Sequence, residues 1–289
     1  MFQPYHARVV RRLSFLLSAF LLLMVACNND DDDQLPEEVF SVKLTTNATF
    51  GSILTDGQNN TLYYFTRDVA GTSACSGNCA AVWPIFYTNP ADMKLGTGLK
   101  AEDFATITRA DGSLQTTYRG WPLYYYAPAN SAGQNVREKP GETLGDQVAN
   151  KTWFVVKPDY TVMIATASVL DKTTNQTSTQ NFLVDPAART LYIFDRDNRL
   201  PTTLPTNCTG GCIAAWPVFY TEKLVLPSSL NASDFGAITR TDGPNGTTRQ
   251  HTTYKGLPIY YYTPDGTTRG KVEGHGVKTG QDPWYVANP

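Results

Sequence analysis

Four of the five cysteines in this chain of 289 residues lie in two closely spaced pairs. Each pair opens a segment that runs through Trp-Pro to Phe-Tyr-Thr: CSGNCAAVWPIFYT, residues 75–88, and CTGGCIAAWPVFYT, residues 208–221. Cysteine pairs of this kind hold a metal ion, act as a redox dithiol or form a structural disulfide. These chemistries belong to different functional classes, so the choice depends on the rest of the sequence.

The N-terminus has the features of an export signal. Basic residues precede an apolar run at residues 13–26, LSFLLSAFLLLMVA, which stops at small residues before Cys27. The run is shorter than the about 20 apolar residues that a membrane-spanning helix needs. Its ending, MVAC, resembles the lipobox of bacterial lipoproteins, in which the signal is cut before a cysteine that then carries a lipid. We therefore predict a lipoprotein signal peptide at residues 1–26 and lipidation of Cys27, with a plain secretory signal or an uncleaved anchor as alternatives.

A polar, acidic segment follows Cys27. NNDDDDQLPEE, residues 28–38, has too little apolar surface to offset the entropy of ordering itself, so we predict a flexible tether over residues 27–38. An acidic run directly after a lipidated cysteine also resembles the surface-export signal of some bacterial lipoproteins. That resemblance implies a location on the cell surface, anchored to the outer membrane, whereas a spacer facing the periplasm is the alternative.

The charge of the chain excludes one class of partner. Its 24 basic and 26 acidic residues nearly balance. The predicted signal peptide has an excess of basic residues and the tether an excess of acidic ones, so the rest of the chain is also close to neutral. A folded part so nearly neutral lacks the basic field that binds nucleic acid or anionic lipid. We expect no nucleic-acid partner, and contact with the membrane only through the lipid on Cys27.

Because exported proteins reach an oxidising environment, disulfides are the favoured interpretation of the cysteine pairs. Zinc sites typically use C-x2-C spacing or histidine, and both histidines beyond the leader, His251 and His275, lie in the second half of the chain. Redox dithiols usually have C-x-x-C spacing. Gly77 in one pair and Gly210-Gly211 in the other allow the tight turn that a disulfide of this spacing requires. We predict no metal and no cofactor, and two disulfides, Cys75 with Cys79 and Cys208 with Cys212.

Nearly everything after the tether occurs twice. TLYYFTRD at residues 61–68 matches TLYIFDRD at 190–197, and TTYRGWPLYYYAP at 116–128 matches TTYKGLPIYYYTP at 252–264. Short segments rich in Thr, Val, Ile, Tyr and Phe alternate with turn sequences, a pattern typical of strands. We therefore predict an all-β fold of two tandem modules, residues 39–158 and 159–289. We also expect hairpins at 52–65 and 181–194, and single helical turns capped by polar residues at 100–104 and 231–235.

A shorter pattern recurs inside each module. It has a tyrosine, an aromatic residue two positions later and an aspartate three positions after that, and its residues are Tyr63, Phe65 and Asp68; Tyr124 and Tyr126; Tyr192, Phe194 and Asp197; and Tyr260, Tyr262 and Asp265. In one copy Ala129 replaces the aspartate. The sequence here resembles the bacterial lipoprotein repeat family with a Y-x-(F/W/Y)-x-x-D motif, a secreted repeat of unknown function. The resemblance covers both modules, agrees with the lipobox and implies no particular activity.

The aromatic motif has two interpretations. Successive strand residues point to opposite faces, so Tyr63 and Phe65 share one face of their strand. In the favoured interpretation such rings pack in the core, Asp68 closes the strand end by bonding nearby amides, and Arg109 is a candidate ion-pair partner of Asp68. In the other, an exposed platform stacks against a sugar ring or a partner; its residues are Trp121, Tyr125, Tyr126, Tyr261 and Tyr262.

The acids and histidines do not form a catalytic set. The acids that recur are Asp68 with Asp197, Asp103 with Asp234, and Asp111 with Asp242. The last two precede glycine, as in turns, and the spacing pairs no two acids as general acid and base. His251 replaces Gln115 of the first module and His275 lies in a Gly-rich turn, so we interpret both as surface residues. The chain has no nucleophile elbow, phosphate loop or metalloprotease motif, and we do not expect an enzyme.

Together these features favour a lipid-anchored, extracytoplasmic, non-catalytic binding or envelope-associated module, whose glycan or protein ligand the sequence does not identify. The alternative is a redox or electron-transfer accessory protein that uses the cysteine pairs or a bound metal. N-x-S/T sequons, which would suit a eukaryotic secreted glycoprotein, are outweighed by the lipobox.

Overall fold

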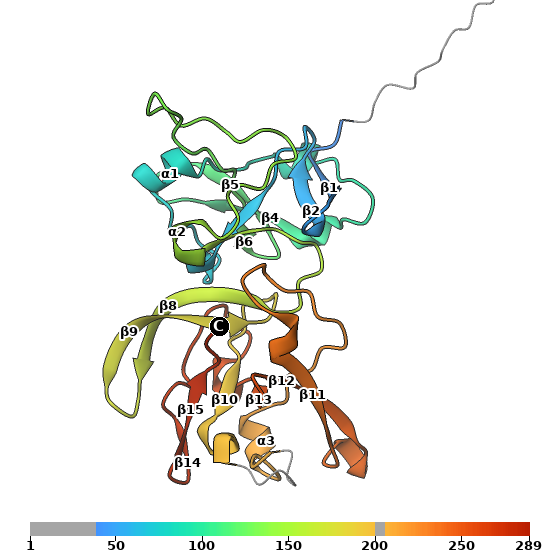
Figure 1. Ribbon diagram of the computed structural model, residues 1–289, viewed down its shortest axis with the longest axis vertical. Helices are drawn as coiled ribbons and strands as arrows, with labels where there is room; N and C mark the ends of the chain where they lie inside the picture. The colour runs from blue at the N-terminus through green and yellow to red at the C-terminus, as the bar shows by residue number, and fades with distance from the viewer. Residues whose placement is uncertain (1–38, 200–205) are drawn as a thin grey trace, which may run out of the picture. The chain divides into compact units, whose positions relative to one another are not determined.

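The computed structural model describes residues 39–199 and 206–289 (Figure 1). The signal peptide and tether predicted at residues 1–38, with Cys27, lie outside the described residues. Residues from Val39 to Pro289 form one compact unit. Within it we call residues 39–158 the first module and residues 159–289 the second module, and the boundary between them stays a prediction.

Strands dominate the regular structure, which confirms the all-β prediction. They are β1 Val42–Asn47, β2 Gly51–Asp56, β3 Tyr63–Phe65, β4 Phe104–Thr108, β5 Leu114–Tyr118, β6 Trp121–Pro122, β7 Trp153–Val155, β8 Met163–Asp171, β9 Gln176–Val184, β10 Tyr192–Phe194, β11 Phe235–Arg240, β12 Arg249–Tyr254, β13 Leu257–Tyr260, β14 Lys278–Thr279 and β15 Asp282–Val286. The helices are short: α1 Asn78–Val82, α2 Val148–Lys151 and α3 Cys212–Ala215, with 3-10 turns η1 Thr66–Asp68, η2 Pro90–Asp92, η3 Ala101–Asp103, η4 Asp195–Arg199, η5 Ala232–Asp234, η6 Pro244–Gly246 and η7 Thr263–Asp265.

The strand order repeats along with the sequence. In the second module one antiparallel sheet has the order β11-β12-β13-β10-β15-β14. The first module has the corresponding sheets β4-β5-β6 and β3-β7, which a single bridge joins between Tyr63 and Tyr124. Tyr192 and Tyr260 form the same pair within β10 and β13. The two-stranded sheets β1-β2 and β8-β9 complete the correspondence.

The hairpins expected at 52–65 and 181–194 are only partly correct. The chain does reverse after Asp56, whose amide donates to the Asn60 carbonyl, but β2 pairs with β1 and β3 pairs with β7. In the second module β9 likewise pairs with β8. The expected helical turns are present as η3 and η5, but neither has a side-chain cap at its start.

Strand β3 is buried on both faces. Tyr64 packs in a large core cluster, and its neighbours Tyr63 and Phe65 pack in a smaller one with Trp83 and Trp153. Phe65 stacks on Trp153 with ring centroids 4.1 Å apart, and Trp153 stacks on Trp83 at 3.6 Å. The second module repeats this stack, with Phe194 on Trp284 at 4.2 Å and Trp284 on Trp216 at 3.7 Å.

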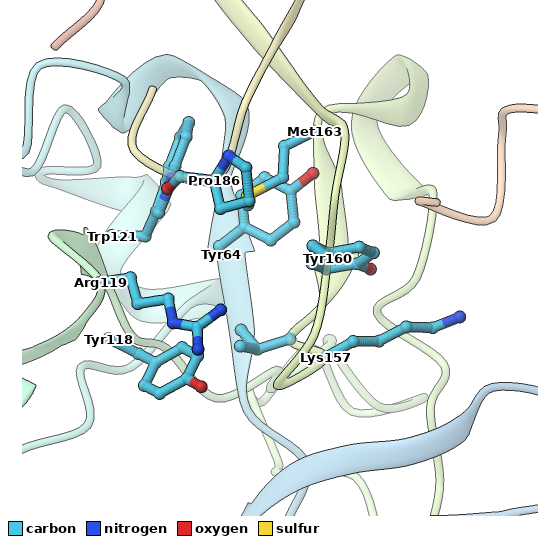
Figure 2. A pocket seen from close by; sticks show the side chains of 9 residues that line it. Tyr64, Tyr118, Arg119, Trp121, Lys157, Tyr160, Met163 and Pro186 are labelled. Carbon is cyan, nitrogen blue, oxygen red and sulfur yellow. The ribbon is translucent and has the colours of Figure 1, made fainter. Parts of the chain in front are cut away.

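The large core cluster continues from one module into the other. Trp121 Nε1 donates to the Pro186 carbonyl at 3.2 Å, and the Arg269 guanidinium lies 5.0 Å from the Trp121 ring centre. Arg269 Nη1 also donates to the Arg119 carbonyl at 2.9 Å, beside Gly120. A pocket at this junction is drawn in Figure 2, with Tyr64, Trp121 and Pro186 around it. Its volume is about 10 Å³, room for about one water molecule, so the junction is closely packed.

Candidate functional site

Both cysteine pairs are disulfides, as predicted. The sulfur atoms of Cys75 and Cys79 are 1.99 Å apart, and those of Cys208 and Cys212 are 2.00 Å apart. Gly77 and Gly210 have φ values of 57° and 59°, a conformation that glycine adopts without steric cost. Within residues 39–199 and 206–289, no three His, Cys, Asp or Glu side chains gather as metal ligands.

A buried polar network joins each disulfide loop to the end of a motif strand. In the first module Asp68 accepts hydrogen bonds from the Tyr124 hydroxyl at 2.6 Å and from the Ala74 amide at 2.7 Å. Asp68 therefore closes the strand end, as the core interpretation requires. Ser73 Oγ lies 2.6 Å from the same hydroxyl and accepts from Arg109 Nη1. Arg109 Nη2 donates to the carbonyl of Cys75 at 2.5 Å.

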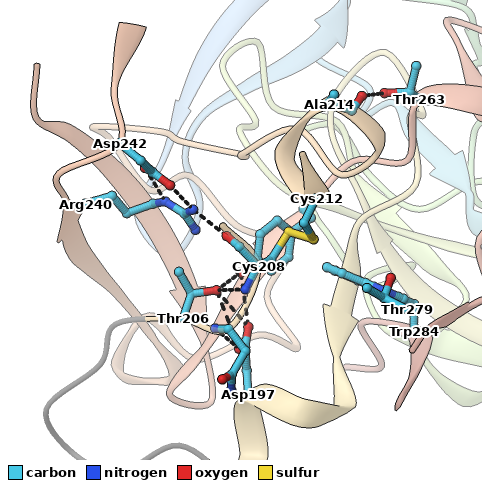
Figure 3. The surroundings of a disulfide bond; sticks show 12 residues. Asp197, Thr206, Cys208, Cys212, Ala214, Arg240, Asp242, Thr263, Thr279 and Trp284 are labelled. Carbon is cyan, nitrogen blue, oxygen red and sulfur yellow. Dashed lines mark hydrogen bonds and ion pairs between the residues drawn. A yellow bond between two sulfur atoms is a disulfide. The ribbon is translucent and has the colours of Figure 1, made fainter. Parts of the chain in front are cut away.

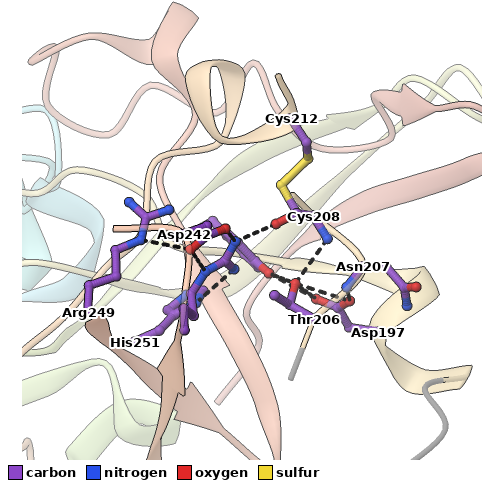
Figure 4. A network of polar contacts seen from close by, with 10 residues as sticks. Asp197, Thr206, Asn207, Cys208, Cys212, Asp242, Arg249 and His251 are labelled. Carbon is purple, nitrogen blue, oxygen red and sulfur yellow. Dashed lines mark hydrogen bonds and ion pairs between the residues drawn. A yellow bond between two sulfur atoms is a disulfide. The ribbon is translucent and has the colours of Figure 1, made fainter. Parts of the chain in front are cut away.

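The second module builds the same network with different side chains (Figures 3 and 4). Asp197 accepts from the Tyr260 hydroxyl at 3.0 Å, from Thr206 Oγ1 at 3.2 Å and from the Asn207 amide at 2.7 Å. Arg240 Nη2 donates to the carbonyl of Cys208 at 2.6 Å. Arg240 thus takes the place of Arg109, and Thr206 takes the place of Ser73.

The predicted ion pair between Arg109 and Asp68 is wrong. Arg109 reaches Asp68 only through Ser73 and the Tyr124 hydroxyl, and it pairs with Asp111 at 3.6 Å instead. Asp242 likewise does more than form a turn, because Arg240 Nε donates to it at 2.9 Å. Asp103 pairs with Arg119 at 3.2 Å. The side chains of these acids thus fix local structure. Asp234 contributes through its backbone instead, since its carbonyl accepts a hydrogen bond from the Lys255 amide.

The interpretation of both histidines as surface residues is wrong. His251 is 0% exposed and His275 is 4% exposed. His251 Nε2 donates to the Ile259 carbonyl at 2.7 Å, where Gln115 Nε2 donates to the Leu123 carbonyl at 2.8 Å. Burial is the main reason that the pKa of His251 falls to about 4, and the nearby Arg240 and Arg249 charges lower it further. The ring is neutral at pH 7 and serves as a hydrogen-bonding replacement for glutamine.

His275 also has a structural role. Its Nδ1 accepts from the Val286 amide at 3.2 Å, where Asp146 Oδ1 accepts from the Val155 amide at 3.1 Å in the first module. Burial lowers the pKa of His275, so the neutral ring is favoured.

Each module has a second hydrogen bond between a tyrosine hydroxyl and a carboxylate. The sequence motif contains the acid of this pair in the second module but not in the first. The Tyr192 hydroxyl donates to Asp265, the motif acid, at 2.6 Å. In the first module, where Ala129 replaces the motif acid, the Tyr63 hydroxyl donates to Glu138 at 2.5 Å. A glycine amide contacts the hydroxyl in both cases, Gly145 in the first module and Gly274 in the second.

The buried carboxyls hold their protons more tightly than exposed ones. Burial raises the pKa of Asp68 to about 7 and that of Glu138 to about 7, against the effect of their hydrogen bonds. It also raises the pKa of Asp197 and Asp265. The tyrosine hydroxyls opposite them have raised pKa values as well, so these phenols remain protonated donors.

The aromatic platform is not present as a continuous exposed surface. Trp121 is 2% exposed and Tyr125 is 9% exposed. Tyr126, Tyr261 and Tyr262 are half-buried. Tyr262 stacks on Trp216 at 4.2 Å, and Arg189 covers Tyr261 at 4.1 Å. These contacts favour the core interpretation of the rings.

Two larger pockets are present in the described residues. One of about 120 Å³ lies beside Arg189, Tyr261, Tyr262 and Asp265. The other has a volume of about 340 Å³, and its lining comes from α2, β8, β9 and the later part of the second module: Asn150, Lys151, Ile164, Asn181, Ser229, Asn288 and Pro289. The second pocket is the roomier site for a ligand.

A family model matches part of the chain. Residues 44–86 and 105–136 match the model of a family described as a secreted repeat of unknown function. The first segment contains the motif at Tyr63 and the second the motif at Tyr124. Comparisons with curated proteins and with solved structures give no match. In the part of the chain that the structure describes, no helix has the length and apolar character to span a bilayer.

Proposed function

We propose that this chain, which carries the secreted repeat of unknown function, is a lipid-anchored extracytoplasmic binding module without catalytic activity. The observation that supports the proposal is that its reactive groups are already engaged. Buried tyrosine hydroxyls donate to four carboxylates, those of Asp68, Glu138, Asp197 and Asp265. Both cysteine pairs are closed as disulfides. These groups hold a framework, and the open surface around it is left for binding.

The anchor is supported by the lipobox and the acidic tether. A Cys27→Ser variant, compared with an Asn28→Ser control next to it, tests this in the native host. We expect the unmodified chain and the control in the outer-membrane fraction and the Cys27→Ser variant outside it. Protease treatment of intact cells then distinguishes the cell surface from the periplasmic face. Retention of the Cys27→Ser variant in the membrane would contradict the anchor.

Binding is tested with the mature chain on glycan and protein arrays, with the heat-unfolded chain as a control. We expect a specific ligand on one of the two arrays. Silence on both would remove the binding function and leave a structural role in the envelope.

The redox alternative is tested by intact mass and metal analysis of the purified protein. The structure predicts a mass with four hydrogens missing and no bound metal, because both disulfides are closed. Four reactive thiols or a stoichiometric metal would instead support the alternative.

A further inference from the structure

The pocket of about 340 Å³ has the size of a small-ligand site. Ligand pockets are commonly about 300–1,000 Å³ and often form where two domains meet. This pocket fits both descriptions, since Asn150 and Lys151 come from the first module and Ile164, Asn181 and Asn288 come from the second.

The first-module side of the pocket is held in an unusual backbone conformation. Gln147, Ala149, Asn150 and Lys151 have φ values of 62°, 51°, 59° and 60°. A non-glycine residue in this left-handed region is strained, and such residues gather at ligand sites, where the surrounding structure holds them. Here the Lys151 amide donates to the Gln147 carbonyl at 3.1 Å, and Thr152 Oγ1 donates to the Ala149 carbonyl at 2.8 Å.

The corresponding stretch of the second module avoids this strain. It has glycines at its positive φ positions, Gly276 at 74° and Gly280 at 65°. The first module therefore keeps side chains where its copy has none, and two of them, Asn150 and Lys151, line the pocket.

Some polar groups of the pocket are held by hydrogen bonds within the protein, and others are free to bind a ligand. Asn181 Oδ1 accepts from Thr166 Oγ1 at 2.7 Å, and Asn288 Nδ2 donates to the Asn181 carbonyl at 2.8 Å. These bonds orient the two amides and leave the Asn181 NH₂ group as a donor and the Asn288 carbonyl as an acceptor.

The other polar side chains of the lining have no internal partner. Across the two described ranges, the side chains of Asn150, Lys151 and Ser229 make no hydrogen bond or ion pair with another residue. No acidic side chain lines the pocket, and Lys151 forms no ion pair with Pro289, the residue that completes the lining.

This set of groups selects a class of ligand. Amides that offer both donors and acceptors match the hydroxyls of a sugar, which also do both. An ammonium without an ion-pair partner attracts a carboxylate. Ile164 adds an apolar surface, and no aromatic ring lines the pocket. We propose that the pocket binds an acidic saccharide, with Lys151 on the carboxylate and Asn150, Asn181, Ser229 and Asn288 on the hydroxyls. This inference rests on the proposed binding function and names its ligand class.

The test uses the full mature chain in detergent with four monosaccharides. Glucuronate and galacturonate are the probes, and glucose and galactose are their neutral counterparts. Saturation-transfer NMR detects binding and titration calorimetry gives the dissociation constants. We expect both uronates to bind at least about tenfold more tightly than the neutral sugars, the effect of one charged contact.

Two variants assign the binding to this pocket. Lys151→Gln should remove the preference for uronates, and Lys255→Gln should leave it unchanged. Lys255 is a matched control because it also has a positive φ, of 49°, and does not line the pocket. Equal melting temperatures of the two variants exclude unfolding as the cause.

Each other outcome has a distinct meaning. Equal binding of uronates and neutral sugars overturns the acidic class, and uronate binding that survives Lys151→Gln overturns the site. If neither uronate binds but the arrays show another ligand, this inference fails and the binding function stands. If the arrays are silent as well, both fail.

Discussion

The hydroxyl of Tyr63 donates a 2.5 Å hydrogen bond to Glu138, a residue outside the aromatic motif. In the second module Asp265 of the motif accepts the equivalent bond from Tyr192. The Leu144 amide donates to the other oxygen of Glu138, and the Glu273 amide donates to the other oxygen of Asp265. The position of the acid in space is kept although its position in the sequence has changed.

Loss of Glu138 should therefore destabilise the protein as much as loss of Asp265. Each of Glu138→Ala and Asp265→Ala leaves a buried tyrosine hydroxyl without its acceptor, which costs about 1–3 kcal/mol. Urea unfolding measures the change. Glu142→Ala, in the same loop, is the control and should cost less than about 0.5 kcal/mol. Adding an acid by Ala129→Asp should not restore stability to Glu138→Ala, and restoration would show that the two positions are interchangeable.

The raised pKa of Asp68 predicts that the protein loses stability as pH rises toward 7. The folded-state pKa of about 7 lies above the ordinary value of 3.8 for an aspartate, so the folded state keeps a proton that the unfolded state releases. The stabilisation is complete below pH 3.8 and is lost as pH rises through 7, at up to about 1.4 kcal/mol per pH unit. Asp68→Asn should make the fall in unfolding free energy between pH 5 and 7 shallower, and the exposed Asp92→Asn should not.

His251 acts in the opposite direction. Its folded pKa of about 4 lies below the ordinary value of 6.5 for a histidine, so its contribution is present above pH 6.5 and is lost as pH falls through 4. His251→Gln should remove this loss and still fold, because Gln115 makes the equivalent bond in the first module. The unfolding free energy at pH 7.5 and pH 4.5 measures the effect. A variant whose decline between these values matches that of the unmodified protein would contradict the assignment.

Gly120 and Gly256 offer a matched test of the module junction. Both complete two-residue hairpin loops at positive φ, 77° and 80°, after Arg119 and Lys255 at 49°. A Cβ on Gly120 would lie 2.8 Å from Arg269 Nη1, whereas one on Gly256 has no atom within 4 Å. Alanine should cost about 1–2 kcal/mol at Gly256 from backbone strain.

At Gly120 the cost should be larger by about 1 kcal/mol, because the Arg269 hydrogen bonds are displaced as well. Arg269→Ala should abolish this difference between the two glycine variants. Urea unfolding of the single and double variants gives the coupling, and an unchanged difference would show that Arg269 does not hold the junction.

Local patterns predicted the framework well. Cysteine spacing with intervening glycines predicted the disulfides, and the alternation of β-branched and aromatic segments with turns predicted the all-β fold. Long-range pairing was harder. The turn after Asp56 was visible, but the sequence does not show that β2 pairs with the earlier β1, because both strands flanking the turn have strand-like composition.

Buried polar positions were the main source of error. The sequence favours an exposed His251 because polar side chains usually lie at the surface, yet its match to Gln115, beside the recurring arginines Arg109 and Arg240, marks an internal hydrogen-bonding position. Glu138 was missed because the loop that carries it differs in length between the copies. The left-handed turn at 147–151 has no glycine to indicate it, because its positive φ values fall on other residue types.

Arg269 of the second module packs against Gly71 and Gly120 of the first module. This contact bears on how the two modules assemble. A relative with one module would have to meet a second molecule to cover Trp121, and its assembly would depend on concentration. Fusion into one polypeptide makes that encounter intramolecular, at an effective concentration on the order of millimolar. The duplicated chain thus obtains within one polypeptide the burial that a single module would need a second molecule to reach.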